Sequence, residues 1–287
     1  MVLSCLNMKK KWYKGKVFVI TGASGDIGSA VCRVFAPLGM RMYLLDLPNP
    51  AIDELVEEIK GLGAEYVEWF IMDLTNKEQI SQVLKTIGEK EKRIDILFNN
   101  AGIGSKCSIT NNGSFEEYRK IMSINVDGMW LVLQAALPYI GRPAPTKKHP
   151  NRREGQLIFS SSSAGKTGVP YMAAYAMSKS AIIALANSIR LEYKIQNHKI
   201  DVITVVPAPA DTKFYHTSEM IDWINSYKKK GLLFKFVKTR DIAKRVLKAS
   251  RKRKKEIFVP RWWKLLDILF AFSHHLIGNL LIKIENQ

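Results

Sequence analysis

Short apolar runs of strand length alternate with amphipathic helical stretches along most of this 287-residue chain, and this alternation restricts the possible folds more than any other feature. Apolar strands that alternate with helices are typical of a parallel sheet covered by helices on both faces. The sequence therefore predicts an α/β fold with a doubly wound parallel sheet. The expected strands are residues 17–21, 42–46, 67–71, 94–98, 156–161, 202–206 and 256–259, and the expected helices are residues 27–38, 52–59, 77–87, 121–139 and 172–195.

Two stretches depart from this alternation and bear on the domain organisation. Residues 141–155 contain three prolines and several basic residues, and we expect an exposed surface loop because a strand pattern resumes directly afterwards. Residues 261–287 follow the last expected strand and are rich in apolar residues. We expect one domain over residues 1–260 and an apolar or amphipathic, helical C-terminal extension over residues 261–287.

The net charge of +18 is high, and basic residues gather at positions 9–11, 142–153, 228–230 and 251–255. Such charge suits nucleic acid, an anionic membrane surface or an anionic substrate, and charge alone does not choose between them. Because no recognised nucleic-acid-binding module accompanies it, we do not expect a nucleic-acid partner. The lysines at 9–11 also interrupt the short apolar start of the chain, so a signal peptide is not expected.

Three cysteines, Cys5, Cys32 and Cys107, lie far apart without paired spacing. This pattern predicts neither a disulfide framework nor a zinc site, and we expect no metal. Unpaired thiols suit a reducing compartment, so we expect a cytoplasmic protein.

A glycine-rich turn follows the first expected strand. Residues 21–28 read Thr-Gly-Ala-Ser-Gly-Asp-Ile-Gly and lead directly into a helical pattern. Glycines let the backbone approach a pyrophosphate, and a helix N-terminus offers free N–H groups and a partial positive charge. The turn therefore indicates a dinucleotide-binding loop, with a plain tight turn as the alternative.

Asp46 ends the second expected strand, where a dinucleotide-binding fold places an acidic residue. Its carboxylate can accept hydrogen bonds from both adenosine ribose hydroxyls, and it would repel a 2′-phosphate. No Arg or Lys directly follows Asp46 or occupies the loop between Gly22 and Gly28. This combination favours NAD over NADP. The alternative is a solvated aspartate at a strand end, or a turn former before Pro48.

Tyr175 and Lys179 lie four residues apart on an expected helix, so both side chains share one face. A tyrosine with a pKa of about 10 is a poor base at neutral pH. A nearby ammonium stabilises the phenolate, and we therefore expect Lys179 to lower the pKa of Tyr175. Such a phenol can donate a proton to a carbonyl or accept one from an alcohol.

Taken together, the motifs of this chain resemble those of the short-chain dehydrogenase/reductase family over roughly residues 16–260. This resemblance implies a Rossmann fold with an NAD(P)-binding site in the domain over residues 1–260. The matching positions are the loop at 21–28, Asp73, the Asn-Asn-Ala-Gly at 99–102, Asn125, the Ser-x-Ala-Gly at 162–165, the Tyr-x-x-x-Lys at 175–179, and Pro207 with Thr212.

The same resemblance implies roles for individual residues. Tyr175 would be the general acid/base, and Lys179 would lower its pKa and bind the nicotinamide ribose. Ser162 would hydrogen-bond the substrate oxygen, and Asn125 would hold a water in a proton relay to Lys179. The implied cofactor-binding residues are Gly22, Ser24, Gly25, Ile27, Asp46, Asp73, Leu74, Asn100, Tyr175, Lys179 and Thr212.

Some of these positions have structural alternatives. The serines around Ser162 can be turn formers, Asn125 can kink or cap a helix, and Asp73 can be the N-cap of the following helix.

The chain also departs from the family pattern twice. Asp26 stands at the position of the middle glycine of the loop, which brings a negative charge toward a pyrophosphate. Ala208 replaces a glycine and Pro209 follows it, which stiffens the backbone expected beside the nicotinamide.

Apolar residues are abundant in residues 213–237, where the family forms its substrate lid. They predict a hydrophobic alcohol or ketone of the fatty acyl, steroid or retinoid type, with packing on the core as the alternative. The segment 261–284 starts with two tryptophans after the basic run Arg251–Lys255, which is typical of an interfacial membrane anchor. A helix packed on the subunit or across an oligomer interface is the alternative.

The sequence thus predicts an enzyme that transfers a hydride between NAD and a secondary alcohol or ketone, acting in the cytoplasm at an anionic membrane surface. An NADP-dependent carbonyl reductase of the same family is one competing hypothesis. A non-catalytic, basic regulatory protein that binds nucleic acid through a Rossmann scaffold is another. The resemblance also implies a homodimer or homotetramer.

Overall fold

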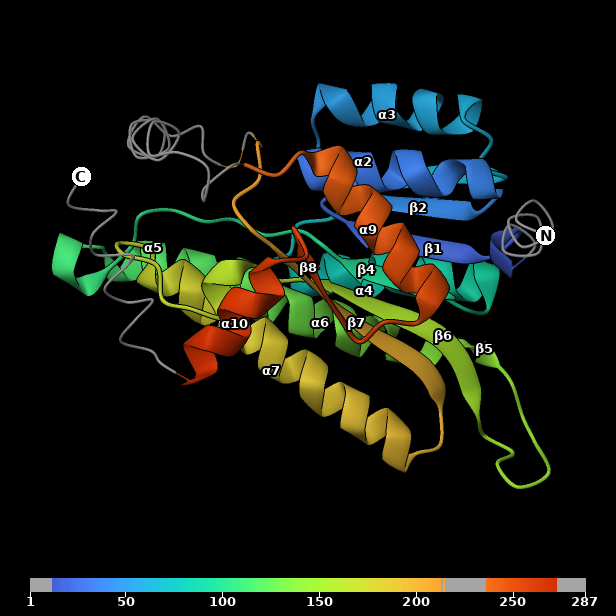
Figure 1. Ribbon diagram of the computed structural model, residues 1–287. Coiled ribbons are helices and arrows are strands. Elements are labelled where there is room, and N and C mark those ends of the chain that lie inside the picture. The colour runs from blue at the N-terminus through green and yellow to red at the C-terminus, as the bar shows by residue number, and fades with distance from the viewer. Residues whose placement is uncertain (1–11, 213, 215–235, 273–287) are drawn as a thin grey trace.

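The computed structural model describes residues 12–212, 214 and 236–272 (Figure 1). It confirms the doubly wound α/β fold: the strand order in the sheet is β3-β2-β1-β4-β6-β7-β8, and these strands run parallel. The short β5 pairs antiparallel with β6. The strands are β1 (Val17–Thr21), β2 (Arg41–Asp46), β3 (Tyr66–Ile71), β4 (Ile96–Asn99), β5 (Arg142–Pro143), β6 (Arg153–Ser160), β7 (Lys199–Pro207) and β8 (Glu256–Val259).

Helices cover both faces of the sheet, because the strands present buried apolar side chains to each side (Figure 1). On one face α2, α3 and α9 pack on alternate strand residues, and on the other α4, α6 and α7 pack on the rest. The longer helices are α2 (Asp26–Phe35), α3 (Pro50–Gly61), α4 (Lys77–Glu91), α5 (Phe115–Met122), α6 (Met129–Ala136), α7 (Ala173–Ile195), α9 (Thr239–Lys252) and α10 (Trp263–Phe272).

The chain reverses its direction across the sheet between β3 and β4. After β3 it returns to the other side of β1, so β1 and β4 are neighbours whose crossover helices lie on opposite faces. In a doubly wound sheet a crevice opens at this point, outside the carboxyl ends of the strands. The fold therefore places a ligand site at the ends of β1 and β4.

Two local expectations differ from the structure. The stretch 141–155 is not entirely a loop, because β5 pairs with the start of β6 and extends that strand as a hairpin. The helix expected over residues 121–139 begins earlier, at Phe115, and contains a π-helical turn, η3 (Ser123–Gly128), between α5 and α6. Of the expected substrate lid and C-terminal extension, residues 213, 215–235 and 273–287 lie outside the described residues.

Among the described helices, one stretch, Phe115–Tyr139, is long and apolar enough to cross a membrane by length and composition. Within it, Val132 and Ala136 are fully buried in the core against α4 and the sheet. Part of its apolar surface therefore packs inside the domain.

Candidate active site

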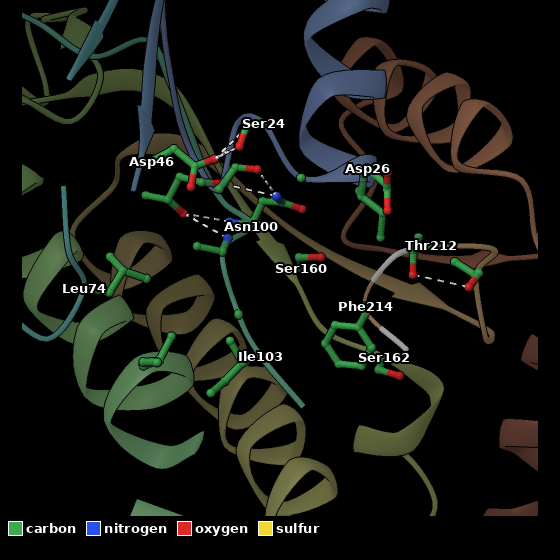
Figure 2. Close-up of a pocket in the computed structure, with 18 of the residues that line it drawn as sticks. Ser24, Asp26, Asp46, Leu74, Asn100, Ile103, Ser160, Ser162, Thr212 and Phe214 are labelled. Carbon is green, nitrogen blue, oxygen red and sulfur yellow. Dashed lines mark hydrogen bonds between the residues drawn. The ribbon is translucent and has the colours of Figure 1, made fainter. Parts of the chain in front are cut away.

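A cavity of about 420 Å³ opens at the carboxyl ends of the central strands. Figure 2 shows its two ends: Ser24 and Asp46 lie at one, and Ser162, Thr212 and Phe214 lie at the other. Of the residues expected in the site, all but Asn125 line this cavity, and they come from sequence positions up to 190 residues apart. They are Gly22, Ser24, Gly25, Ile27, Asp46, Asp73, Leu74, Asn100, Ser162, Tyr175, Lys179 and Thr212.

The glycine loop forms a cradle between β1 and α2. Gly22 has a φ of +64°, and a Cβ on it would come within 2.8 Å of the Ala101 backbone, so a side chain is excluded there. Gly25 precedes α2 and no side chain caps the first N–H groups of the helix. Uncapped N–H groups and the positive end of the helix dipole suit a phosphate, so the loop fits a dinucleotide pyrophosphate.

The departure at Asp26 leaves this loop intact. Asp26 is the first residue of α2, where a carboxylate interacts favourably with the helix dipole, and it lines the cavity. The close backbone approach of the loop depends on the glycines on either side of it. The substitution therefore adds a charge to the cavity wall without changing the turn.

Asp46 is held against the glycine loop. The backbone N–H and the hydroxyl of Ser24 both donate to its Oδ2 at 2.7 Å, and the N–H of Leu47 donates to its Oδ1 at 2.8 Å. Asn49 donates in turn to the Ser24 hydroxyl at 3.0 Å. The sequence analysis missed the roles of Ser24 and Asn49 in positioning this carboxylate, which nothing in their spacing indicates.

The lining of the cavity is acidic. Asp26, Asp46 and Asp73 all line the cavity, and Lys179 is the only cation among its described lining residues. Asp73 accepts hydrogen bonds from the N–H and hydroxyl of Thr75 at 2.8 Å, and Asn76 is the N-cap of α4. The N-cap alternative for Asp73 is therefore wrong, because Asn76, three residues later, caps the helix.

Asn100 joins the end of β4 to the glycine loop. Its Nδ2 donates to the carbonyls of Thr21 and Gly22 at 3.2 and 3.1 Å. The hydroxyl of Thr21 accepts hydrogen bonds from the N–H groups of Asn100 and Ala101 at 3.0 and 3.1 Å. Thr21 is thus a further site residue, and its position directly before Gly22 at the end of β1 was the available signal.

The Ser162 hydroxyl lies close enough to the Tyr175 phenol to affect its pKa. Burial raises the pKa of Tyr175 to about 12, and the Ser162 hydroxyl opposes this rise. The two preceding serines contact Lys179 instead: the Ser161 hydroxyl donates to the Lys179 carbonyl at 2.9 Å, and the Ser160 backbone carbonyl accepts from the Lys179 ammonium. Ser162 is therefore the serine that meets the phenol, although its Oγ also accepts from the N–H of Ala164 at 3.2 Å.

Lys179 is only 4% exposed, and its Nζ donates to the Ser160 carbonyl at 3.1 Å. The same Nζ lies 5.6 Å from the centroid of the Tyr175 ring, so the two side chains share one site. Burial lowers the pKa of Lys179 to about 8. The expected lowering of the Tyr175 pKa is not found, because burial raises the pKa of this phenol and the smaller, opposing effect comes from Ser162.

Asn125 is placed behind the cavity by the π-helical turn η3, and it is 1% exposed. Its Nδ2 donates to the Ile103 carbonyl at 2.8 Å and to the Ser178 hydroxyl at 2.9 Å, and its Oδ1 accepts from the Ile103 N–H at 2.8 Å. A Cβ on Gly102 would come within 2.9 Å of this Oδ1 and 3.2 Å of the Lys179 Nζ. Gly102 therefore lets the backbone pass between Asn125 and Lys179.

Phe214 packs directly on the catalytic phenol candidate. Its ring centroid lies 5.4 Å from that of Tyr175, with an interplanar angle of 54°. A Cβ on Gly104 would come within 2.3 Å of the Phe214 ring, so Gly104 makes room for the aromatic side chain. Beside it, the Thr212 hydroxyl donates to the Ala210 carbonyl at 3.4 Å.

The second departure from the family pattern is also accommodated. Ala208 is 4% exposed, and its N–H donates to the Val259 carbonyl at 2.8 Å. Its methyl group lies in the apolar core beside the cavity, so the alanine fits without opening the backbone.

A glycine cradle at the switch point of a doubly wound sheet, next to a Tyr–Lys–Ser constellation, defines a nicotinamide-dinucleotide oxidoreductase of the Rossmann class. Residues 16–220 match the sequence profile of the short chain dehydrogenases. This chain therefore belongs to the short-chain dehydrogenase/reductase family, whose members are NAD(P)-dependent oxidoreductases.

Individual relatives agree with this assignment. The chain is 30% identical to the 3-oxoacyl-[acyl-carrier-protein] reductase FabG of Thermotoga maritima over 190 residues, which are 66% of this chain and 73% of FabG. It is 33% identical to the oxidoreductase UcpA of Escherichia coli K12 over 66% of this chain and 68% of UcpA. A short chain dehydrogenase/reductase from Burkholderia phymatum, solved in complex with NAD, has the same fold: its TM-score is 0.78 at 21% identity, over 92% of this chain and 95% of that one.

Proposed function

We propose that this protein is a cytoplasmic, NAD-dependent dehydrogenase/reductase that interconverts a secondary alcohol and a ketone on an apolar, lipid-like substrate. The observation that carries the proposal is the constellation at one end of the cavity. There the phenol of Tyr175 and the Ser162 hydroxyl line the cavity close enough for Ser162 to affect the pKa of the phenol, and the Lys179 ammonium lies 5.6 Å from the centroid of the phenol ring.

These side chains can move one proton at the substrate oxygen. In the reducing direction, the Tyr175 hydroxyl donates its proton to that oxygen while Ser162 donates a hydrogen bond to it. In the oxidising direction, Tyr175 accepts the proton of the alcohol, and the Lys179 ammonium stabilises the phenolate. The nicotinamide, when bound, supplies or takes up the hydride at the substrate carbon.

The choice of NAD rests on the acidic adenosine end of the cavity. Asp46 lies where the adenosine ribose hydroxyls would be recognised, and a 2′-phosphate there would face its carboxylate and that of Asp73. Ser24 already binds Oδ2 of Asp46, so the carboxylate is oriented before a cofactor arrives. The relative solved with NAD is in keeping with this choice.

An apolar substrate is supported by the walls around the phenol. Phe214 packs on Tyr175, and Ile103, Ala208 and Ala210 also line the cavity. Of the substrate types that we consider, a fatty acyl ketone also agrees with FabG, which is named for the reduction of 3-oxoacyl groups.

The test is an activity screen with lipid alcohols and ketones, using NAD and NADP separately and following the nicotinamide absorbance. We expect turnover with NAD and a loss of at least about 1,000-fold in Tyr175→Phe, since the proton donor is removed. Tyr118→Phe, which removes a phenol outside the cavity, is the control. Better turnover with NADP would overturn the cofactor choice, and full activity in Tyr175→Phe would overturn the mechanism.

A further inference from the structure

Exposed apolar side chains form one face of α10. Trp262, directly before the helix, is 40% exposed, and Leu265, Ile268 and Leu269 are 64%, 44% and 57% exposed. Their spacing of three and four residues puts them on one side of the helix. We call these four residues the α10 apolar face, and such a group of large exposed apolar side chains marks an interaction surface.

The opposite side of α10 is fixed to the domain. Trp263 packs on the core, and Asp267 forms an ion pair with Lys166 at 3.7 Å. Lys166 also pairs with Glu256 of β8 at 2.7 Å. Burial raises the pKa of Asp267 and the Lys166 ammonium opposes that rise, as expected for a carboxylate turned toward the protein. The apolar face is therefore held outward.

Positive charge borders the α10 apolar face. Arg261 and Lys264 are exposed within and just before the helix. Arg245 of α9 lies close enough to Arg261 for their like charges to lower its pKa, after the larger effect of burial. Exposed basic side chains beside apolar residues suit an anionic surface with hydrocarbon beneath it.

The basic run Arg251–Lys255 lies elsewhere. It precedes β8, whereas α10 follows β8, so the two are at opposite ends of this strand (Figure 1). Four residues of strand span about 13 Å. The run therefore does not border the α10 apolar face, and the two basic regions can be tested separately.

We propose that α10 is a membrane-contact helix that binds an anionic lipid surface. The α10 apolar face enters the boundary between headgroups and acyl chains, and Arg261 and Lys264 pair with lipid phosphates. Because α10 begins at the carboxyl end of β8, on the edge of the sheet where the cavity opens, the bound protein has its cavity on the side of the bilayer. This contact is independent of the chemistry proposed above.

Co-sedimentation of the full-length chain with vesicles tests the proposal. We expect binding to vesicles of phosphatidylcholine with phosphatidylglycerol, and much weaker binding to phosphatidylcholine alone or at high salt. Leu265→Glu with Leu269→Glu should lower the binding constant at least about 30-fold. Ile195→Glu, a 79% exposed residue at the end of α7, is the matched control and should leave binding unchanged.

Charge is tested with a second matched pair. Arg261→Gln with Lys264→Gln should weaken binding about 10- to 30-fold, since each basic residue at the surface contributes about fivefold or slightly less. Lys254→Gln with Lys255→Gln removes the same charge from the run at the other end of β8, and it should have little effect. Thermal unfolding of each variant checks that the fold is retained.

Two results would overturn the proposal. One is vesicle binding that survives Leu265→Glu with Leu269→Glu, or that depends equally on both charge pairs. The other is that the wild type does not bind vesicles, while the variant Leu265→Glu with Leu269→Glu differs from it in mass by light scattering. That result would make the face a contact between copies of this chain. Turnover of a water-soluble substrate, measured in parallel, reports on the proposed activity alone.

Discussion

Burial of the Lys179 ammonium in the candidate active site lowers the stability of the folded protein. The ammonium is almost completely buried, and burial lowers its pKa from 10.5 to about 8. Between these two pH values the unfolded chain binds more protons than the folded protein, so this residue makes stability rise with pH in that window. Below pH 8 the full penalty of burying the charge applies.

Lys179→Met should therefore abolish turnover and yet raise the free energy of unfolding at pH 7. The pKa shift corresponds to about 3 kcal/mol, from which the lost hydrogen bond to the Ser160 carbonyl subtracts about 1 kcal/mol. The gain should shrink as the pH rises from 8 toward 10.5. Urea unfolding of both proteins at pH 7 and pH 9.5 measures it, and a variant less stable than the wild type at pH 7 contradicts the account.

Gly102→Ala should displace the Asn125 amide or the Lys179 ammonium, both of which lie close to the Gly102 backbone in the wild type. The new methyl would lie 2.9 Å from Asn125 Oδ1 and 3.2 Å from Lys179 Nζ, so one of them must move. We expect kcat to fall about 10- to 100-fold with cofactor affinity little changed. Gly168→Ala, whose Cβ meets nothing within 4 Å, is the control. Equal kinetics for the two variants would argue against a role for this approach.

The sequence is a good guide to some of these residues and a poor guide to others. Tyr175 and Lys179 could be predicted to share a site because a helical turn fixes their relation. The raised pKa of Tyr175 could not be predicted, because the phenol is buried partly by Phe214, a residue 39 positions away along the chain. Ser178 and Asn49 act through hydrogen bonds that form only once distant elements have packed.

At the scale of elements, η5 (Ser163–Gly165) and α10 are joined through one side chain. Lys166 follows η5 directly, and it is the only described partner of both Glu256 and Asp267 in an ion pair. Ser162 is the N-cap of η5, so this link runs from the site serine to the C-terminal helix.

Lys166→Met should loosen α10 without unfolding the domain, because Asp267 then remains partly buried with no ion-pair partner among the described residues. We expect amide hydrogen exchange in residues 263–272 to become several-fold faster by mass spectrometry. Lys60→Met breaks the exposed Lys60–Glu57 pair on α3 and should change exchange little. Unchanged exchange in α10 would show that apolar packing alone holds the helix.

Elements were predicted unevenly, for physical reasons. The central strands were placed within a few residues because both faces are buried and their apolar runs are continuous. The helix over residues 121–139 was expected to be regular, but the wider turn at η3 depends on one extra residue in the hydrogen-bonding pattern and leaves no mark in apolar spacing. The helix α9 was missed, because basic residues outnumber the apolar positions that it buries.

On the scale of the whole molecule, the carboxyl and amino edges of the sheet carry different structural features. The carboxyl edge carries the cavity, whereas the amino edge carries a buried polar network. There the Tyr13 hydroxyl bonds to the Ser250 hydroxyl at 2.7 Å, and Gln156 bonds to the Ser250 hydroxyl and carbonyl. This network ties the N-terminal end of the described chain to α9 and β6.

Ser250→Ala should therefore destabilise the fold and leave the chemistry intact. The change leaves Gln156 Oε1 and the Tyr13 hydroxyl without this partner in a buried place, which costs about 1–3 kcal/mol. Ser180→Ala removes a more exposed hydrogen bond to the Gly165 carbonyl and should cost much less. Denaturant unfolding measures the difference, and a fall in kcat for Ser250→Ala would show that the two edges are coupled.

The ring of Phe214 against the phenol of Tyr175 has a consequence for selectivity. A substrate whose oxygen reaches that phenol arrives where an aromatic side chain is already packed. Such a substrate packs against the Phe214 ring, so the ring limits which molecular outlines fit beside the phenol. Discrimination between substrates then depends on how well their shape fits against the ring as well as on how hydrophobic they are.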